Sequence, residues 1–197
     1  MVAVAAVFIG GAAPVAGPAS SPMVKTALDY LRGLATVDGR FEQTDARDAV
    51  STGRFFLQRP GRARFDYDPP AQLSIISDGH KVFVINGRLK TLQSYPLAMT
   101  PFGLFLAREI RLAQGARVTS VGNRPGGFSI TAVARRSPTR GSITLDFNRS
   151  PVALTGWSIG GGGGRPVRVR LLSLAPATPR DDSWFDARRR AAELGAH

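Results

Sequence analysis

Few side chains in this chain of 197 residues have the types and spacing that catalysis needs. His80 and His197 are the only two histidines, and they stand too far apart in sequence to form a local pair of metal ligands. His80 also follows an Asp-Gly turn signal, so we expect it to be exposed. Asp66 and Asp68 alternate with arginines, which indicates a row of surface ion pairs facing water rather than a carboxylate pair for acid–base catalysis. We therefore expect no metal site, no cofactor and no enzyme activity.

Arg59 has an unusual position at the end of a strand predicted over residues 53–59. Strand alternation places Arg59 on the same face as Phe55 and Leu57. A buried arginine without a partner is costly, so this side chain needs hydrogen-bond acceptors. An exposed arginine at a strand end is the alternative. The glycines at 160–164 lack the Lys-Ser/Thr pair of a phosphate-binding loop and predict a flexible connection instead.

Residues 53–106 alternate apolar and polar side chains and end in a short, almost wholly apolar helix. This pattern is typical of a half-buried antiparallel sheet that curls round its apolar face and is covered by the helix. Such a container favours the binding of a hydrophobic ligand. The predicted cavity wall consists of Phe55, Leu57, Phe65, Tyr67, Leu73, Ile75, Val82, Val84, Ile143 and Leu145. The predicted lid consists of Met99, Phe102, Phe105 and Leu106. Ordinary core packing is the alternative for each of these residues.

The elements that position these residues follow from periodicity and turn signals. Apolar residues at helical spacing predict an amphipathic helix over 20–36, and Thr100-Pro101 predicts the start of the lid helix. Asp-Gly and Asn-Gly pairs eight residues apart predict an up-and-down meander. Predicted strands cover 39–46, 53–59, 62–68, 73–77, 81–86, 89–94, 116–122, 127–135, 141–148, 152–159 and 165–175. A sheet of that size must curl or close.

Composition supports a turn-rich β protein, with 22 glycines and 14 prolines. The chain has no cysteine, which excludes disulfides, cysteine-based zinc sites and a lipid anchor on an N-terminal cysteine. The formal net charge is +12. A basic solvated surface explains this charge most simply, while attraction to anionic lipid or to nucleic acid is the more specific interpretation.

The first residues resemble a secretory signal peptide over 1–19. An apolar run from Met1 to Ile9 precedes small residues and a possible cleavage point after Ala19, although no basic residue comes first. Either the true start lies upstream or the signal is degenerate. We expect one domain over 20–175 and a C-terminal tail over 176–197. The tail contains a possible short helix with Trp184 and Phe185 at its start.

One ordered set of short motifs resembles the LolA family, the periplasmic lipoprotein carriers of Gram-negative bacteria. In chain order the set is Gly39-Arg40-Phe41-Glu42-Gln43, Gly53, Leu57-Gln58-Arg59-Pro60, Phe65-x-Tyr67, Ser77-Asp78-Gly79, Thr100-Pro101-Phe102 and Leu104. Their order and spacing agree over about 65 residues, and the later strands fit with weaker signal. The tail departs from the best-known carriers.

This resemblance implies an incomplete, unclosed antiparallel β-barrel of about eleven strands with a helical lid. Its apolar cavity takes the acyl chains of a lipoprotein. The carrier is a soluble periplasmic monomer without a cofactor. It receives cargo from a LolCDE-type inner-membrane transporter and passes it to a LolB-type outer-membrane acceptor. The resemblance further implies that Arg59 latches the lid through hydrogen bonds.

Three other functions are compatible with parts of the sequence. An exported lipid-binding or envelope-sensor module would share the same fold. A nucleic-acid binder would explain the charge, but the arginines are dispersed and the aromatic residues fall on the predicted inner face. A hydrolase would need a nucleophile and base in a recognisable context, which the sequence does not offer. The acceptor LolB is disfavoured because no cysteine is present to carry its anchor.

Overall fold

The computed structural model describes residues 18–107, 116–134, 141–161 and 163–197. The predicted signal peptide over 1–19 lies almost wholly outside these residues, so its cleavage point stays a prediction. Within the described residues, no helix is both long and apolar enough to cross a membrane.

The eleven strands form one antiparallel sheet. They are β1 (Thr36–Thr44), β2 (Val50–Gln58), β3 (Arg62–Tyr67), β4 (Leu73–Asp78), β5 (Lys81–Asn86), β6 (Thr91–Pro96), β7 (Ala116–Arg124), β8 (Gly127–Ala134), β9 (Ser142–Arg149), β10 (Val152–Gly160) and β11 (Val167–Pro176). Their order in the sheet is β6-β5-β4-β3-β2-β1-β11-β10-β9-β8-β7. The first and last strands in sequence therefore pair at the centre, and β6 and β7 are the two free edges.

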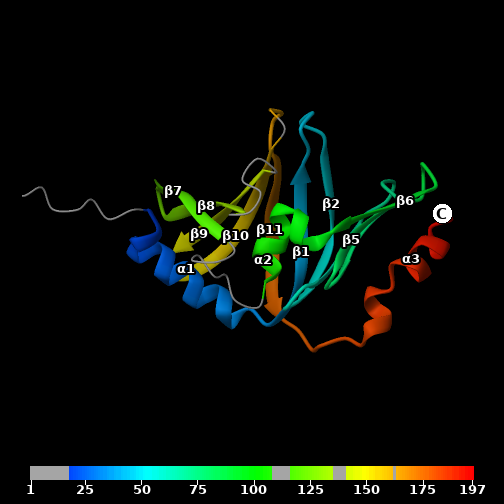
Figure 1. Ribbon diagram of the computed structural model, residues 1–197, viewed down its shortest axis with the longest axis horizontal. Helices are drawn as coiled ribbons and strands as arrows, with labels where there is room; N and C mark the ends of the chain where they lie inside the picture. Colours follow the sequence, from blue (N-terminus) through cyan, green and yellow to red (C-terminus); the bar gives the residue numbers. More distant parts are fainter. Residues whose placement is uncertain (1–17, 108–115, 135–140, 162) are drawn as a thin grey trace, which may run out of the picture.

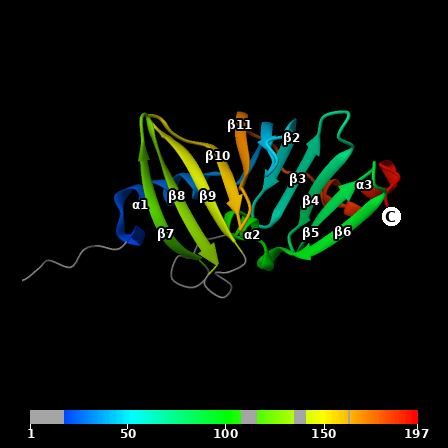
Figure 2. The same cartoon turned by 90° about the horizontal axis from the view of Figure 1, so that it is seen from above.

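The sheet bends into an open gutter, as Figures 1 and 2 show. Two up-and-down meanders, β1–β6 and β7–β11, make its two halves. The chain between β6 and β7 has to cross from one edge to the other, and its described part carries η2 (Leu97–Met99) and α2 (Pro101–Leu106). The lid is thus the connection between the two edges of the gutter. The predicted fold class, an unclosed antiparallel barrel with a helical lid, is confirmed.

Helix α1 (Pro22–Gly33) covers part of the concave face. Pro22 occupies its first turn, as the sequence predicts, and Val24, Ala27 and Leu31 bury its apolar stripe in the main core. The helix ends at Gly33, before the predicted limit of residue 36, because Thr36 already pairs with Gln58 of β2. A turn, η1 (Pro18–Ser20), lies before α1 and contacts β7.

The C-terminal tail covers the convex face of the other half of the sheet. It contains η4 (Asp182–Phe185) and α3 (Ala187–Glu193), and Asp186 caps α3 by accepting hydrogen bonds from two backbone amides. Trp184 and Phe185 thus belong to a separate 3₁₀ turn rather than to the start of the helix. The tail and the sheet form a second apolar cluster of Phe56, Ile76, Ile85, Phe185, Ala187, Ala191 and Ala196. These sheet residues alternate with residues of the main core, so both faces of β2–β5 are covered.

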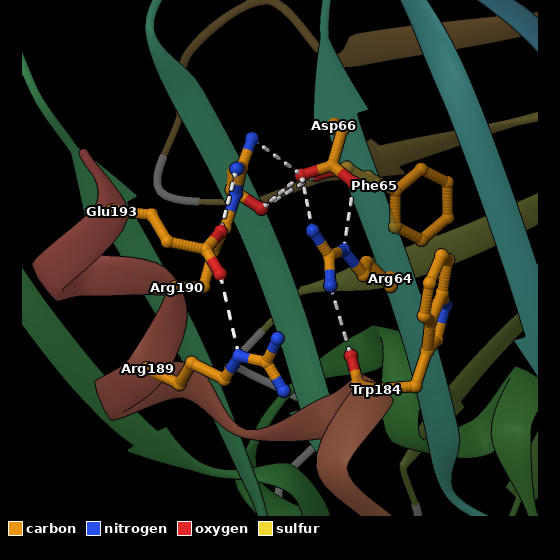
Figure 3. Close-up of polar contacts among 8 residues, drawn as sticks. Arg64, Phe65, Asp66, Trp184, Arg189, Arg190 and Glu193 are labelled. Carbon is orange, nitrogen blue, oxygen red and sulfur yellow. Dashed lines mark hydrogen bonds and ion pairs between the residues drawn. The ribbon is translucent and has the colours of Figure 1, made fainter. Parts of the chain in front are cut away.

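The tail also corrects the prediction that the Arg64 and Asp66 side chains face open water. Figure 3 shows them beneath the tail. Arg64 donates to Asp66 over 2.7 Å and lies over the Trp184 ring at 4.8 Å from its centroid. Arg190 of α3 reaches Asp66 over 3.1 Å, and Glu193 accepts from Arg190 over 3.0 Å. The predicted row of ion pairs exists, and Arg190 and Glu193 of the tail extend it.

Candidate functional site

Helix α2 lies across the middle of the concave face, as Figure 1 shows. Thr100 caps it by accepting a hydrogen bond from the Gly103 amide over 3.2 Å, and Pro101 follows in the first turn. Gly103 is required there because a Cβ atom would lie 2.4 Å from the carbonyl oxygen of Leu97. The sequence over 97–103 therefore folds η2 tightly against α2 and directs the apolar side of α2 toward the sheet.

Aromatic side chains join α2 to the floor of the gutter. Phe105 stacks on Trp157 of β10 with ring centroids 5.6 Å apart, and Phe102 lies 6.2 Å from the same ring. Phe65 of β3 completes the group, 5.7 Å from Phe102 and 6.0 Å from Trp157. Aromatic pairs in these geometries stabilise a contact beyond the apolar area they bury. This packing fills the centre of the concave face and leaves a cavity on either side.

The larger cavity is an apolar pocket of about 270 Å³ between α2 and strands β1, β3–β6, β10 and β11. Its lining consists of Phe41, Gln43, Phe65, Tyr67, Ile75, Val82, Val84, Tyr95, Thr100, Pro101, Phe102, Trp157, Ile159, Val167 and Val169. Tyr95 keeps 47% exposure, so the pocket reaches the surface near the end of β6. This is the candidate ligand site, and we call it the main pocket.

The polar groups of the main pocket are hydrogen-bonded within the protein. The Tyr67 hydroxyl donates to Oε1 of Gln43 over 2.7 Å, and burial raises the pKa of the Tyr67 phenol. The hydroxyl of Thr100 donates to the carbonyl of Leu97 over 2.9 Å. A neutral phenol, an amide and a hydroxyl offer no base or nucleophile with an activating partner. The pocket is therefore suited to holding apolar groups.

The smaller cavity has a volume of about 30 Å³ and lies on the other side of α2, under α1 and strands β7–β9. Ile143, Leu145 and Phe105 line it together with Leu31 of α1. A space of this size holds about one water molecule. Helix α1 therefore fills the gutter over β7–β9, and the space that can hold a ligand is the main pocket.

The structure brings only part of the predicted set together. Phe65, Tyr67, Ile75, Val82 and Val84 line the main pocket, and Phe102 of the predicted lid faces it. Ile143, Leu145 and Phe105 line the smaller cavity. Phe55 and Leu57 line neither cavity because the core encloses them, and Leu73 packs at the margin of that core. Leu106 is fully buried, while Met99 is 47% exposed.

Trp157 is the main residue that the sequence interpretation missed. It lies on a strand that was predicted correctly, but the pairing of β10 with β9 shifts between Leu154 and Gly156. This irregularity lets Leu154 and Trp157, which simple alternation puts on opposite faces, both enter the core. The sequence showed only a tryptophan inside a predicted strand. That indicates that the side chain is buried but not which face of the sheet it occupies.

Arg59 joins the C-terminal ends of the two helices. Its Nη2 atom donates to the carbonyl of Ala107 over 2.6 Å, and its Nη1 atom donates to the carbonyl of Leu31. Leu31 lies in the last turn of α1, and Ala107 follows the last residue of α2. Backbone carbonyls meet the predicted need for acceptors at both Nη atoms, whereas the Nε atom is buried without a hydrogen-bond partner among the described residues.

The hydrogen-bond acceptors of the Arg59 guanidinium are neutral backbone carbonyls. Burial lowers the pKa of the guanidinium, and within the described residues no carboxylate forms an ion pair with it. Unpaired carbonyls at helix C-termini carry partial negative charge, which favours a cation there. Nearby, the Gly61 amide donates to the carbonyl of Leu106 over 2.8 Å. The turn after β2 therefore holds the end of α2 through both a side chain and the backbone.

These features define the class of the protein, an open half-barrel of antiparallel strands with a helix over an apolar pocket. The chain belongs to the LolA family: the family model described as "Outer membrane lipoprotein carrier protein LolA" matches residues 32–188. Members of this family are carriers and not enzymes. The match extends from the end of α1 into α3, so it includes the main pocket, Arg59 and most of the tail.

Named relatives agree with this assignment. An outer-membrane lipoprotein carrier protein of Methylococcus capsulatus is 29% identical over 168 residues, which cover 82% of this chain and 80% of that protein. The corresponding protein of Leptothrix cholodnii is 32% identical over 103 residues, 48% of this chain and 49% of that one. Among solved structures, a putative outer membrane lipoprotein-sorting protein domain from Vibrio parahaemolyticus shares the fold. Its TM-score is 0.52 at 8% identity, covering 86% of this chain and 97% of that chain.

Proposed function

We propose that this protein is a periplasmic carrier that binds the acyl chains of lipoproteins in its main pocket and moves them from the inner to the outer membrane. The observation that carries the proposal is the main pocket itself, an apolar space bounded on one side by the short helix α2. Family membership supplies the class of cargo.

The energetics of an acyl chain explain why a carrier needs such a pocket. Burial of one methylene is worth about 0.8 kcal/mol, so a chain of about 15 methylenes gains roughly 12 kcal/mol on leaving water. Without enclosure the cargo would aggregate or return to a membrane. An apolar pocket gives this protection, and the few polar groups of its lining are already hydrogen-bonded within the protein.

The volume of the main pocket implies that α2 moves when cargo binds. Ligand sites for small molecules usually span about 300–1,000 Å³, whereas the main pocket measures about 270 Å³. A lipoprotein with three acyl chains needs far more space than that. Displacing Phe102 and Phe105 from Trp157 would merge the main pocket with the smaller cavity and expose the whole gutter floor.

The contacts of Arg59 favour the closed, empty form. Its hydrogen bond to Ala107 exists only while α2 lies on the sheet, whereas its bond to Leu31 anchors the guanidinium to α1. Cargo entry would break the bond to Ala107, and its re-formation would help to expel the cargo at the acceptor. Arg59 is therefore the proposed latch of the lid, and α2 with Met99 is the proposed lid.

The route of the cargo follows from the same proposal. We expect a LolCDE-type transporter to load the carrier at the inner membrane and a LolB-type acceptor to unload it at the outer membrane. We also expect the protein to be a soluble, exported monomer. An exported lipid-binding or envelope-sensor module is the competing function of the same fold.

Analysis of bound material tests the proposal directly. The protein is purified from the periplasm of its own organism, and its bound material is identified by mass spectrometry. Co-purified triacylated lipoproteins are the expected result. Free phospholipid without any lipoprotein would contradict the carrier function and favour the lipid-binding alternative.

A further inference from the structure

The two edges of the gutter differ in ways that matter for binding a polypeptide. Strand β6 has the sequence Thr-Leu-Gln-Ser-Tyr-Pro and carries no charged residue, and its residues 93–96 are exposed. Among the described strands, β6 pairs only with β5. Alternate backbone amides and carbonyls of such an edge strand point away from the sheet and can pair with an added strand.

Proteins normally protect a free edge of this kind. Inserted charges, a covering element or a very short strand prevent unwanted pairing. The opposite edge shows such protection: β7 carries Arg117 and Arg124, and Arg124 forms an ion pair with Asp146 of β9. The turn η1 also contacts β7. Strand β6 has none of these charges, and Pro96 at its end lacks the amide that a ladder hydrogen bond needs.

The unprotected edge adjoins the main pocket. Tyr95 of β6 lines that pocket, is half-exposed and pairs across the strands with Val82. Gln93, two residues earlier in β6, pairs with Val84, and both valines also line the pocket. Exposed Met99 follows in the lid. An acyl group in the main pocket therefore lies beside a strand edge that can accept backbone hydrogen bonds.

We propose that the edge of β6 binds the polypeptide segment next to the acylated cysteine of the cargo as an added β-strand. This inference rests on the proposed carrier function, and it assigns a second contact to the same ligand. The acyl chains and the polypeptide leave one cysteine in different directions, so a protein that buries the chains must place the polypeptide at the margin of the pocket. The free backbone groups of β6 lie at that margin.

Pairing through the backbone suits a carrier with many cargoes. Main-chain hydrogen bonds do not depend on side-chain identity, so unrelated segments can bind the same edge. Two or three such bonds raise affinity by about tenfold or more. Because β6 is uncharged, it can bind polypeptide segments of either net charge.

Hydrogen exchange on the whole protein tests the inference with two matched probes. The first is tripalmitoylated cysteine followed by a five-residue uncharged peptide, and the second is tripalmitoylated cysteine amide alone. We expect the first probe to bind about tenfold more tightly. We also expect it to slow the exchange of the outward-facing amides of Leu92 and Ser94 by a similar factor, while the second probe leaves them unchanged.

A pair of lysine variants gives a control that does not depend on exchange. Ser94→Lys places a charge on the exposed edge of β6, and Ser120→Lys places the same charge on exposed β7. Ser94→Lys should abolish the advantage of the peptide-bearing probe and leave binding of the peptide-free probe unchanged. Ser120→Lys should bind both probes like the wild type.

Three results overturn the inference. Equal binding of both probes with fast exchange in β6 excludes the added strand but leaves the carrier function intact. Failure of both probes to bind excludes the carrier function, and the inference with it. Amides of β6 that are already slow without ligand, with a rate that depends on protein concentration, would show that a second copy of this chain occupies the edge.

Discussion

Arg59 and Asp146 show how single polar side chains are held in this fold. The guanidinium of Arg59 donates to two helix-end carbonyls, whereas the carboxylate of Asp146 accepts a charged hydrogen bond from Arg124. Both groups are partly buried, and burial shifts both pKa values toward the neutral form. The consequences differ because an arginine stays charged whereas the aspartate can be protonated in acid.

Removing the side chain of Arg59 should weaken release more than binding. Arg59→Leu loses the charge-assisted bond to Ala107 that is specific to the closed form, worth about 1.5–3 kcal/mol. The variant should hold a triacylated lipopeptide longer and pass it to acceptor vesicles about tenfold more slowly or worse. Single-turnover transfer of a labelled lipopeptide measures this rate.

The matched control for this variant is Arg54→Leu. Arg54 lies on β2, the strand that precedes Arg59, and its exposed side chain donates no hydrogen bond within the described part of the chain. It should transfer cargo like the wild type. Equal transfer rates for Arg59→Leu and the wild type would exclude the latch.

Asp146 predicts a pH dependence of stability with a definite sign. Burial raises its pKa, against the opposing effect of Arg124, so its folded pKa lies above the unfolded value of about 3.9. The stability that it contributes is complete below that value and is lost as the pH rises through the folded pKa. Asp146→Asn resembles the protonated form. Its melting temperature relative to the wild type should therefore rise between about pH 3 and pH 6.

Asp68 is a control whose pKa is shifted in the opposite direction from that of Asp146. The Thr52 hydroxyl and Arg40 lower the pKa of Asp68, so its contribution is present above about 3.9 and is lost as the pH falls. Asp68→Asn should lose stability relative to the wild type as the pH rises over the same range. Thermal unfolding monitored by circular dichroism measures both trends, and parallel trends would contradict the assignment.

At the level of elements, the C-terminal tail acts as an outer layer for β2–β5. The side chain of Phe185 is 3% exposed and lies in the second cluster, 6.1 Å from the ring of Phe56. The Arg62 guanidinium lies over the Phe185 ring at 5.6 Å from its centroid. These strands also form much of the wall of the main pocket, so the tail and the pocket share the same strands from opposite sides.

Truncation of Phe185 tests whether the tail belongs to the folded core. Phe185→Ala should destabilise the protein by about 3–5 kcal/mol, as expected for a buried phenylalanine. The control is Leu172→Ala in β11. The Leu172 side chain is 45% exposed, so its truncation should cost far less stability. Chemical denaturation measures both values. Similar costs for the two variants would mean that the tail contributes little to stability.

At the level of the whole molecule, cargo can enter in two ways: α2 can lift, or the two halves of the sheet can splay apart. The amide of Gly61 reports on the first, because its acceptor is the carbonyl of Leu106 in α2. The amide of Arg59 is a matched control, since it donates over 2.8 Å to Ala35, which is outside the lid.

Binding of an acylated ligand should speed the exchange of the Gly61 amide and leave that of the Arg59 amide unchanged. Lifting of α2 removes only the first acceptor. Residue-resolved hydrogen exchange by nuclear magnetic resonance distinguishes the two amides. Faster exchange across the paired strands β1 and β11 would instead indicate that the halves of the gutter separate.

The sequence predicted the strands well because turn signals and alternation are local. Asp78-Gly79 and the Asn86-Gly87 pair marked two hairpins, and the apolar alternation of β3 and β5 put the correct residues into the main pocket. The resemblance to the LolA family added the lid and Arg59. The partners of Arg59 were not predictable, since they are backbone carbonyls far away in sequence.

Long-range packing set the limits of the prediction. The role of the tail was missed because Phe56, Ile76 and Ile85 occupy the face that alternation assigns to solvent. The irregular pairing in β10 hid the direction of Trp157. Phe55 and Leu57 were expected in the cavity wall, yet the core encloses them, since alternation gives the face of a strand but not the empty space beside it.

The choice of acceptors at Arg59 has a consequence for where this protein can work. Backbone carbonyls do not ionise, and an arginine stays charged even when burial lowers its pKa. The closure of α2 should therefore be the same in acidic and in mildly alkaline surroundings. A latch built on aspartate would open in acid, whereas this one is suited to a compartment with no buffering of its own.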